Sequence, residues 1–183
     1  MSVIDYITET VEQLSRKYMT RDPFELCDAL GVSIRYKDMG TDIKAYYFCH
    51  ARIRNIVVNS RVSETVRRIL VAHELGHDQL HREIALLKGF YEVEMFDMAV
   101  PTEYEANIFA AELLIDDIVL LEMLNDEDKS FFGAARELYV PAELLDFKFR
   151  VLKHKGYHIE PPGIGRGDFL KKDIDGCFGE EYD

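Results

Sequence analysis

The chain has 183 residues, of which 48% are hydrophobic, and this is enough for one compact core with a small accessory region. Its 34 acidic and 22 basic side chains give a formal net charge of −12. Because nucleic-acid binding depends on neutralising phosphates, this balance argues against direct binding of DNA or RNA. It favours a basic protein partner, unless the acidic side chains serve only to keep the surface soluble.

The sequence also predicts where the protein works. No apolar run approaches the length of about 18 residues that a membrane span needs, and the N-terminal segment carries acids where a signal peptide would carry bases. The three cysteines, Cys27, Cys49 and Cys177, have no paired spacing and are expected to be reduced. We therefore expect a cytoplasmic protein that does not associate with membranes.

The first third of the chain is predicted to contain two helices and three strands. Residues 2–19 have the pattern of an amphipathic helix, and a short helix follows between the cap residue Asp22 and Gly31. Residues 32–36, 43–50 and 53–59 are predicted to be strands, the last two forming a hairpin.

Residues 73–77, His-Glu-Leu-Gly-His, carry the chemistry of a zinc hydrolase. Ser63 is a suitable N-cap, and the apolar residues after it recur at three- and four-residue spacing, which predicts a helix. On a helix His73 and His77 share a face, so both rings can reach one metal ion. Gly76 costs about 1 kcal/mol relative to alanine in a helix interior, and its presence suggests that another backbone approaches closely here.

Two histidines need a third protein ligand. His81 is the next step of four residues, but about 12 Å of straight helix would separate it from His73. The ligand should therefore come from a second helix over residues 102–114, which offers Glu103, Glu105 and Glu112. These three are equally possible on the residues alone, and Glu105 could instead belong to a capping box that starts at Thr102.

The two segments together resemble the ImmA/IrrE family of zinc metallopeptidases. The resemblance rests on HELGH followed by His81 and on EYEANIFAAELL at residues 103–114, and it covers roughly residues 20–125. It implies that the third ligand is Glu105, the glutamate directly before the alanine of the family pattern E-x-E-A-x-x-F-A. One departure is visible, because Ile115-Asp116-Asp117 stands where similar chains often have Met-Pro.

A catalytic mechanism follows from these expectations. Zinc would be held by His73, His77 and Glu105, and Glu74 would act as general base on a water molecule. Candidates for stabilising the oxyanion or binding substrate are Tyr46, Tyr47, Tyr91 and His81. The aromatic segment at residues 45–48 could form an edge strand that binds extended substrate by strand addition.

The second half of the chain is less informative. Residues 82–100 are a long connection rich in large apolar side chains, which can indicate a lid. Residues 130–156 have the pattern of two helices joined by a turn at Tyr139-Val140, as in a helix-turn-helix. However, Glu143 and Asp146 lie in the first turns of the would-be recognition helix, which favours packing or partner recognition over DNA reading.

We therefore expect an α+β protein in which a short antiparallel sheet packs on the metal helix and a second ligand helix, followed by a helical C-terminal appendage. The expected divisions are a metallopeptidase domain at 1–125, a helical region at 126–160 and an irregular tail at 161–183. The expected function is a zinc-dependent endopeptidase, and the resemblance implies a helix-turn-helix repressor of a phage or mobile element as its substrate. The alternative is a non-proteolytic regulator that binds a repressor or DNA through residues 130–156.

Overall fold

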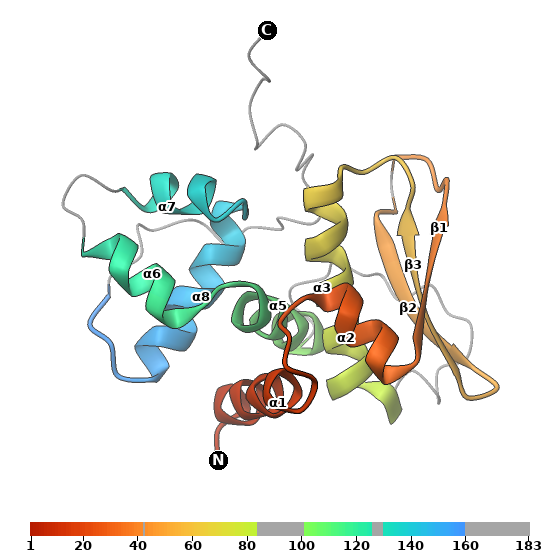
Figure 1. Cartoon of the computed structure of the whole chain (residues 1–183), viewed down its shortest axis with the longest axis horizontal. Helices are drawn as coiled ribbons and strands as arrows, with labels where there is room; N and C mark the ends of the chain where they lie inside the picture. Colours follow the sequence, from red (N-terminus) through yellow and green to blue (C-terminus); the bar gives the residue numbers. More distant parts are fainter. Residues whose placement is uncertain (42, 84–100, 126–129, 160–183) are drawn as a thin grey trace, which may run out of the picture.

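The computed structural model describes residues 1–41, 43–83, 101–125 and 130–159. Within them the chain forms α1 (Val3–Tyr18), α2 (Pro23–Leu30), β1 (Val32–Lys37), β2 (Ala45–His50), β3 (Ile53–Asn59), α3 (Glu64–Leu80), α5 (Pro101–Leu114), α6 (Asp117–Leu124), α7 (Phe131–Glu137) and α8 (Ala142–His154). The predicted α+β class is confirmed. Figure 1 shows the sheet at one side of the molecule, α3 beside it, and α5 in the centre between α3 and α8.

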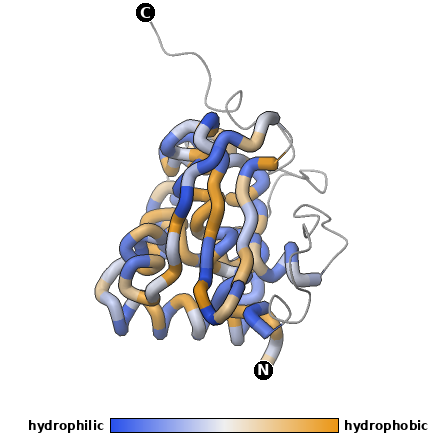
Figure 2. Tube along the Cα trace, turned by 90° about the vertical axis from the view of Figure 1, so that its right-hand side faces the viewer, coloured by the Kyte–Doolittle hydropathy of each residue, from blue (hydrophilic) through white to orange (hydrophobic). Residues whose placement is uncertain are grey.

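The sheet is mixed, which corrects the expectation of an antiparallel one. Its order is β1-β3-β2, with β2 antiparallel and β1 parallel to the central strand β3. The predicted hairpin is confirmed, and its two turn residues, Ala51 and Arg52, have φ of 49° and 67°, as a two-residue type I′ turn requires. Figure 2 looks onto the three strands, with the helices behind them.

Local capping signals place the helices that carry the site. The Ser63 side chain accepts a hydrogen bond from the backbone N–H of Val66, so α3 begins where the sequence predicts. The Asp22 side chain caps α2 in the same way, and Gly31 ends that helix with φ of 70°. By contrast, α5 begins at Pro101, so Thr102 lies inside the first turn and the proposed capping box from Thr102 to Glu105 is wrong.

The C-terminal helices pack against the same core as α3. Hydrophobic side chains from α1, α3, α5 and α8 form one buried cluster, in which α5 contacts α1, α3 and α8. The division at residue 125 stays a prediction, and the tail at 161–183 lies outside the described residues. Among the described helices, none combines the length and apolar composition of a membrane span.

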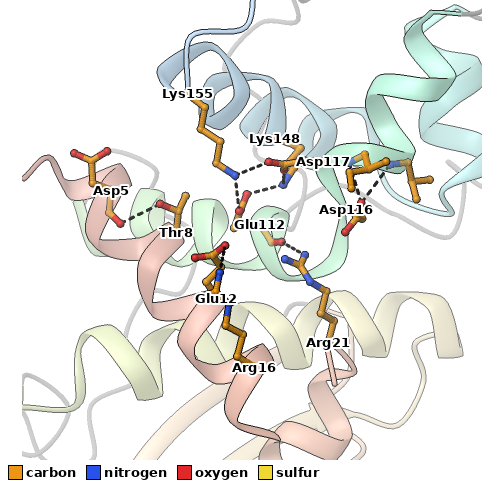
Figure 3. Close-up of polar contacts among 12 residues, drawn as sticks. Asp5, Thr8, Glu12, Arg16, Arg21, Glu112, Asp116, Asp117, Lys148 and Lys155 are labelled. Atoms are coloured by element: carbon orange, nitrogen blue, oxygen red, sulfur yellow. Dashed lines mark hydrogen bonds and ion pairs between the residues drawn. The ribbon is translucent and has the colours of Figure 1, made fainter. Parts of the chain in front are cut away.

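A buried ion network fastens α8 to α5 and α6. Lys148 is fully buried, and its ammonium group lies 2.5 Å from a Glu112 carboxylate oxygen and forms an ion pair with Asp117. Lys155 contacts the same two carboxylates at 2.8 and 2.6 Å, and Arg21 donates to the backbone carbonyl of Glu112. Figure 3 shows these contacts together. The two innermost groups of the network, Glu112 and Lys148, are buried in the core.

Candidate metal centre

Three donor groups meet between α3 and α5. The Nε2 atoms of His73 and His77 are 3.2 Å apart. One carboxylate oxygen of Glu103 lies 3.2 Å from His73 Nε2, and the other lies 3.3 Å from His77 Nε2. Among the described residues, this set is the cluster of histidine and carboxylate side chains that could hold a metal ion.

The approach of two helices creates this cluster. His73 and His77 are one turn apart on α3, so their rings project from the same face. A Cβ atom at Gly76 would lie 3.2 Å from the Ala106 Cα atom and 3.3 Å from its carbonyl oxygen, so the glycine allows α5 to come this close. The expectation of a close backbone approach at Gly76 is thus confirmed, and this contact brings Glu103 to the histidines.

Glu105 does not reach the donor cluster. Its carboxylate oxygen lies 2.9 Å from Nε2 of His81 at the end of α3, and Glu103 occupies the place expected for it. The physical reason is helical periodicity, because residues two positions apart on α5 point in different directions. Glu112 is bound in the Lys148 network and is also absent from the cluster. The geometry therefore favours Glu103 over the Glu105 assignment that the resemblance implied.

Hydrogen bonding orients the His73 ring. Its Nδ1 atom lies 2.9 Å from the Asn107 side-chain oxygen, which is an acceptor in this arrangement. His73 Nδ1 then carries a proton, so a metal ion would bind at Nε2, the atom that faces His77 and Glu103. Asn107 follows Glu103 by four residues on α5, so the same helix face supplies both contacts. The sequence alone gave no signal that singled out Asn107.

The donor set fits a zinc ion. Bonds of 2.0 to 2.1 Å in a tetrahedral site place neighbouring ligand atoms about 3.3 Å apart, close to the separations between the donor atoms here. Imidazole nitrogen and carboxylate oxygen are common zinc ligands. In addition, one buried oxygen of Glu103 has no hydrogen-bond partner among the described residues, and a cation between the three groups would supply one.

Burial and mutual contacts set the protonation of these groups in the metal-free protein. Burial lowers the pKa of His77 to about 4, although its contact with Glu103 acts in the opposite direction. Burial opposes ionisation of Glu103, but its contacts with His73 and His77 outweigh burial and lower the pKa of that carboxyl to about 2. For His73, burial disfavours the cation, yet the contact with Glu103 prevails and raises the pKa. Any proton in the cluster therefore lies between His73 and Glu103, where a metal ion would displace it.

Glu74 lies beside the donors without being one of them. It is buried, and neither carboxylate oxygen has a hydrogen-bond partner among the described residues. Burial raises the pKa of Glu74 to about 8, while the charge of His73 and the nearby main chain of Tyr47 act to lower it. A buried, unpaired carboxylate with such a pKa is suited to exchanging protons near neutral pH.

Strand β2 passes next to the Glu74 carboxylate, and its side chains point alternately to the two faces of the sheet. Tyr47 points toward α3, and its hydroxyl donates a 2.8 Å hydrogen bond to the buried Asp78. Tyr46 and Phe48 lie on the opposite face, with ring centroids 5.8 Å apart. In the described residues β2 pairs only with β3, so its other edge is a sheet edge beside the metal helix.

The four candidates for oxyanion stabilisation differ in their positions and contacts. The hydroxyl of Tyr47 is used by Asp78, which Arg54 also contacts at 2.9 Å. Both ring nitrogens of His81 have partners, one in His77 and one in Glu105. Tyr46 lies on the face away from α3, and Tyr91 lies outside the described residues. The geometry therefore selects none of the four for this role.

The sequence is similar to known proteins over most of its length. It matches the family described as the IrrE N-terminal-like domain over residues 27–150. It is 34% identical over 142 residues to "Uncharacterized immunity region protein 2" of Bacillus phage phi105, covering 78% of this chain and 88% of that protein. It is 24% identical over 148 residues to "Metallopeptidase ImmA" of Bacillus subtilis (strain 168), covering 78% of this chain and 83% of that protein.

Proposed function

The chain belongs to the IrrE N-terminal-like family of metallopeptidases, and on this premise we propose that it is a zinc-dependent endopeptidase that cleaves a specific protein. One observation carries the proposal: Glu74 is buried and unpaired beside a cluster in which His73, His77 and Glu103 direct donor atoms at one point. Three protein ligands with one open position are typical of catalytic zinc sites.

Each residue of the site has a distinct role in this proposal. His73, His77 and Glu103 would hold zinc, which when bound supplies Lewis-acid chemistry and makes water nucleophilic near neutral pH. Glu74 accepts a proton from the water that attacks the scissile carbonyl carbon. It then delivers this proton to the amine nitrogen as the carbon–nitrogen bond breaks.

The substrate backbone would bind along the edge of β2 that pairs with no strand in the described part of the chain. A chain added there would lie next to the strand whose main chain at Tyr47 approaches Glu74. Main-chain hydrogen bonds to β2 would hold the substrate extended. The scissile carbonyl would then lie over the donor cluster, while side-chain contacts determine specificity.

We infer that the substrate is a helix-turn-helix repressor of a phage or mobile element and that cleavage occurs in the cytoplasm. The relative from Bacillus phage phi105 is named as an immunity region protein, which supports a role in phage immunity. The net charge of −12 favours a basic partner such as a DNA-binding protein.

The alternative, DNA binding through α7 and α8, has little support from the side chains of α8. Of its four basic candidates for phosphate contact, Lys148 is buried, Lys155 pairs with Glu112 and Asp117, and Arg150 pairs with Asp146 at 2.7 Å. Lys153 is exposed and has no partner among the described residues. A helix with one such cation lacks the basic footprint of a recognition helix.

Replacement of Glu74 by glutamine tests the proposal. The amide has nearly the same volume, so Glu74→Gln should keep zinc and partner binding but lose roughly 10² to 10⁴-fold in cleavage. The assay is co-expression with a candidate helix-turn-helix repressor, followed by an immunoblot for shortened repressor and a promoter reporter. If Glu74→Gln relieves repression while the repressor stays at full length, the protein acts by binding and the peptidase assignment is wrong.

A further inference from the structure

We infer that His81 and Glu105 form a positioning pair that fixes the ring of His77 for metal binding, an inference that rests on the proposed zinc site. His77 Nδ1 lies 3.1 Å from His81 Nδ1. His81 Nε2 lies 2.9 Å from a Glu105 carboxylate oxygen. The three side chains thus form a continuous chain of contacts from Glu105, in the second turn of α5, to the donor cluster.

The direction of hydrogen bonding along this chain follows from its outer end. An ionised carboxylate only accepts hydrogen bonds, so Glu105 requires the proton of His81 to be on Nε2. In the neutral ring Nδ1 of His81 is then an acceptor, and His77 must donate to it from its own Nδ1. This leaves the lone pair of His77 on Nε2, the atom that faces His73 and Glu103.

The position of His81 makes this arrangement possible. His81 caps α3 at its C-terminal end, four residues after His77, with its ring centroid 5.2 Å from that of His77. Its side chain is 8% exposed and that of Glu105 is 26% exposed, so the contact between them is partly shielded from water. The pair can therefore orient the neighbouring ring of His77.

The two histidines of the cluster are oriented by different devices. His73 is fixed directly by the Asn107 amide oxygen, whereas His77 is fixed through a second imidazole whose own orientation depends on a carboxylate. Partners of this kind, one contact removed from the metal, typically change metal affinity by about 10 to 100-fold when removed. Glu105, which the resemblance implied to be the third ligand, and His81, a candidate for oxyanion stabilisation, thus both receive a positioning role.

The experiment compares zinc affinities of purified full-length variants by competition with a chelator. His81→Leu removes the acceptor for His77 and should weaken zinc binding by about 10 to 100-fold. His81→Asn keeps an amide oxygen near the place of Nδ1 and should recover part of the loss. Glu105→Ala should weaken binding while retaining about one zinc per chain, and Glu105→Gln should weaken it less, since the amide oxygen still accepts.

Two further readouts separate positioning from general stability. Without metal, the variants should unfold at the same denaturant concentration as the wild type. Glu12→Ala is the control for the loss of a negative charge, because it removes an exposed carboxylate that pairs with Arg16. In ¹⁵N-histidine spectra of the metal-free wild type, His77 should be protonated on Nδ1, and His81→Leu should mix the two tautomers.

Unchanged zinc affinity in His81→Leu, or a His77 ring protonated on Nε2 in the wild type, would overturn the inference. A Glu105→Ala protein that binds no zinc would also overturn it, because Glu105 would then be a ligand. Failure of the wild type to bind zinc would instead refute the proposed function. The tautomer measurement on metal-free protein still decides the positioning role in that case.

Discussion

Gly76 on α3 faces the backbone of Ala106 on α5 so closely that an added Cβ atom would lie 3.2 Å from the Ala106 Cα atom. It would lie equally close to Phe109 Cβ, so the obstruction comes from two groups that cannot rotate away. This contact sets the separation of the two helices that carry the donor atoms. The glycine therefore connects the packing of the core with the geometry of the candidate metal centre.

Gly76→Ala is expected to destabilise the protein and weaken metal binding. Alanine gains about 1 kcal/mol from helix propensity, but overpacking against a backbone costs about 1 to 3 kcal/mol. The expected net loss in the free energy of unfolding, measured by urea titration, is up to about 2 kcal/mol. Gly133→Ala is the control, because among the described residues the added Cβ there meets the Ser130 hydroxyl, at 3.3 Å, and no backbone atom. Equal effects of the two substitutions would contradict the role assigned to Gly76.

The identity of the third ligand can be tested by metal content. Glu103→Ala should purify with little zinc, because two histidines alone leave too few ligands for tight binding. Glu105→Ala should keep about one zinc per chain at saturating metal. Elemental analysis of both proteins measures this directly. The opposite pattern, with zinc lost from Glu105→Ala and retained in Glu103→Ala, would restore the assignment that the sequence resemblance implied.

The sequence predicted the α3 part of the site but not its α5 part, and the reason is physical. His73, Glu74 and His77 are fixed relative to one another by one turn of a single helix, so local periodicity suffices. The face of α5 that meets them depends on tertiary packing. Residues 106–113 of α5 are all buried, so the helix has no apolar stripe from which its orientation could be read, and Glu103 could not be preferred over Glu105.

The strands show a similar division. The hairpin of β2 and β3 follows from local sequence, because a two-residue turn joins them. The pairing of β1 with β3 is not local, because β2 lies between these two strands in the sequence. In the sheet, β1 pairs in parallel with the edge of β3 opposite to β2. Strand propensity does not specify which edge a strand joins. The mixed sheet could therefore not be derived from the pattern of residues 32–59.

Glu74 should make the stability of the metal-free protein depend on pH. Its pKa is raised from 4.5 to about 8 in the folded state, so the folded protein retains a proton that the unfolded chain releases. The stabilising contribution is complete below pH 4.5 and is lost as pH rises through 8. The glutamine of Glu74→Gln does not titrate, so this variant has no such loss of stability. In the presence of a chelator, the stability of Glu74→Gln relative to wild type should increase steadily from pH 5 to pH 8 in urea titrations, by at most about 1.4 kcal/mol per pH unit. Parallel curves for the two proteins would show that Glu74 is not held in this environment.

The Lys148 network should be important for stability and irrelevant to metal binding. Glu112→Ala removes a partner of a fully buried ammonium group, which typically costs about 3 to 5 kcal/mol in the free energy of unfolding. The double variant Glu112→Leu with Lys148→Met replaces the buried charges with apolar groups of similar size and should recover much of this loss. Urea titration measures both, and a double-mutant cycle gives the coupling energy.

Zinc content separates this carboxylate from the metal ligands. The folded fraction of Glu112→Ala should bind about one zinc per chain, whereas Glu103→Ala on the same helix should not. Destabilisation alone cannot produce that difference, because zinc is counted per folded molecule after size-exclusion chromatography. If Glu112→Ala lost zinc while remaining folded and as stable as wild type, Glu112 would have to be a ligand. The assignment of the three α5 carboxylates, in which Glu103 binds metal, Glu105 contacts His81 and Glu112 contacts Lys148, would then be wrong.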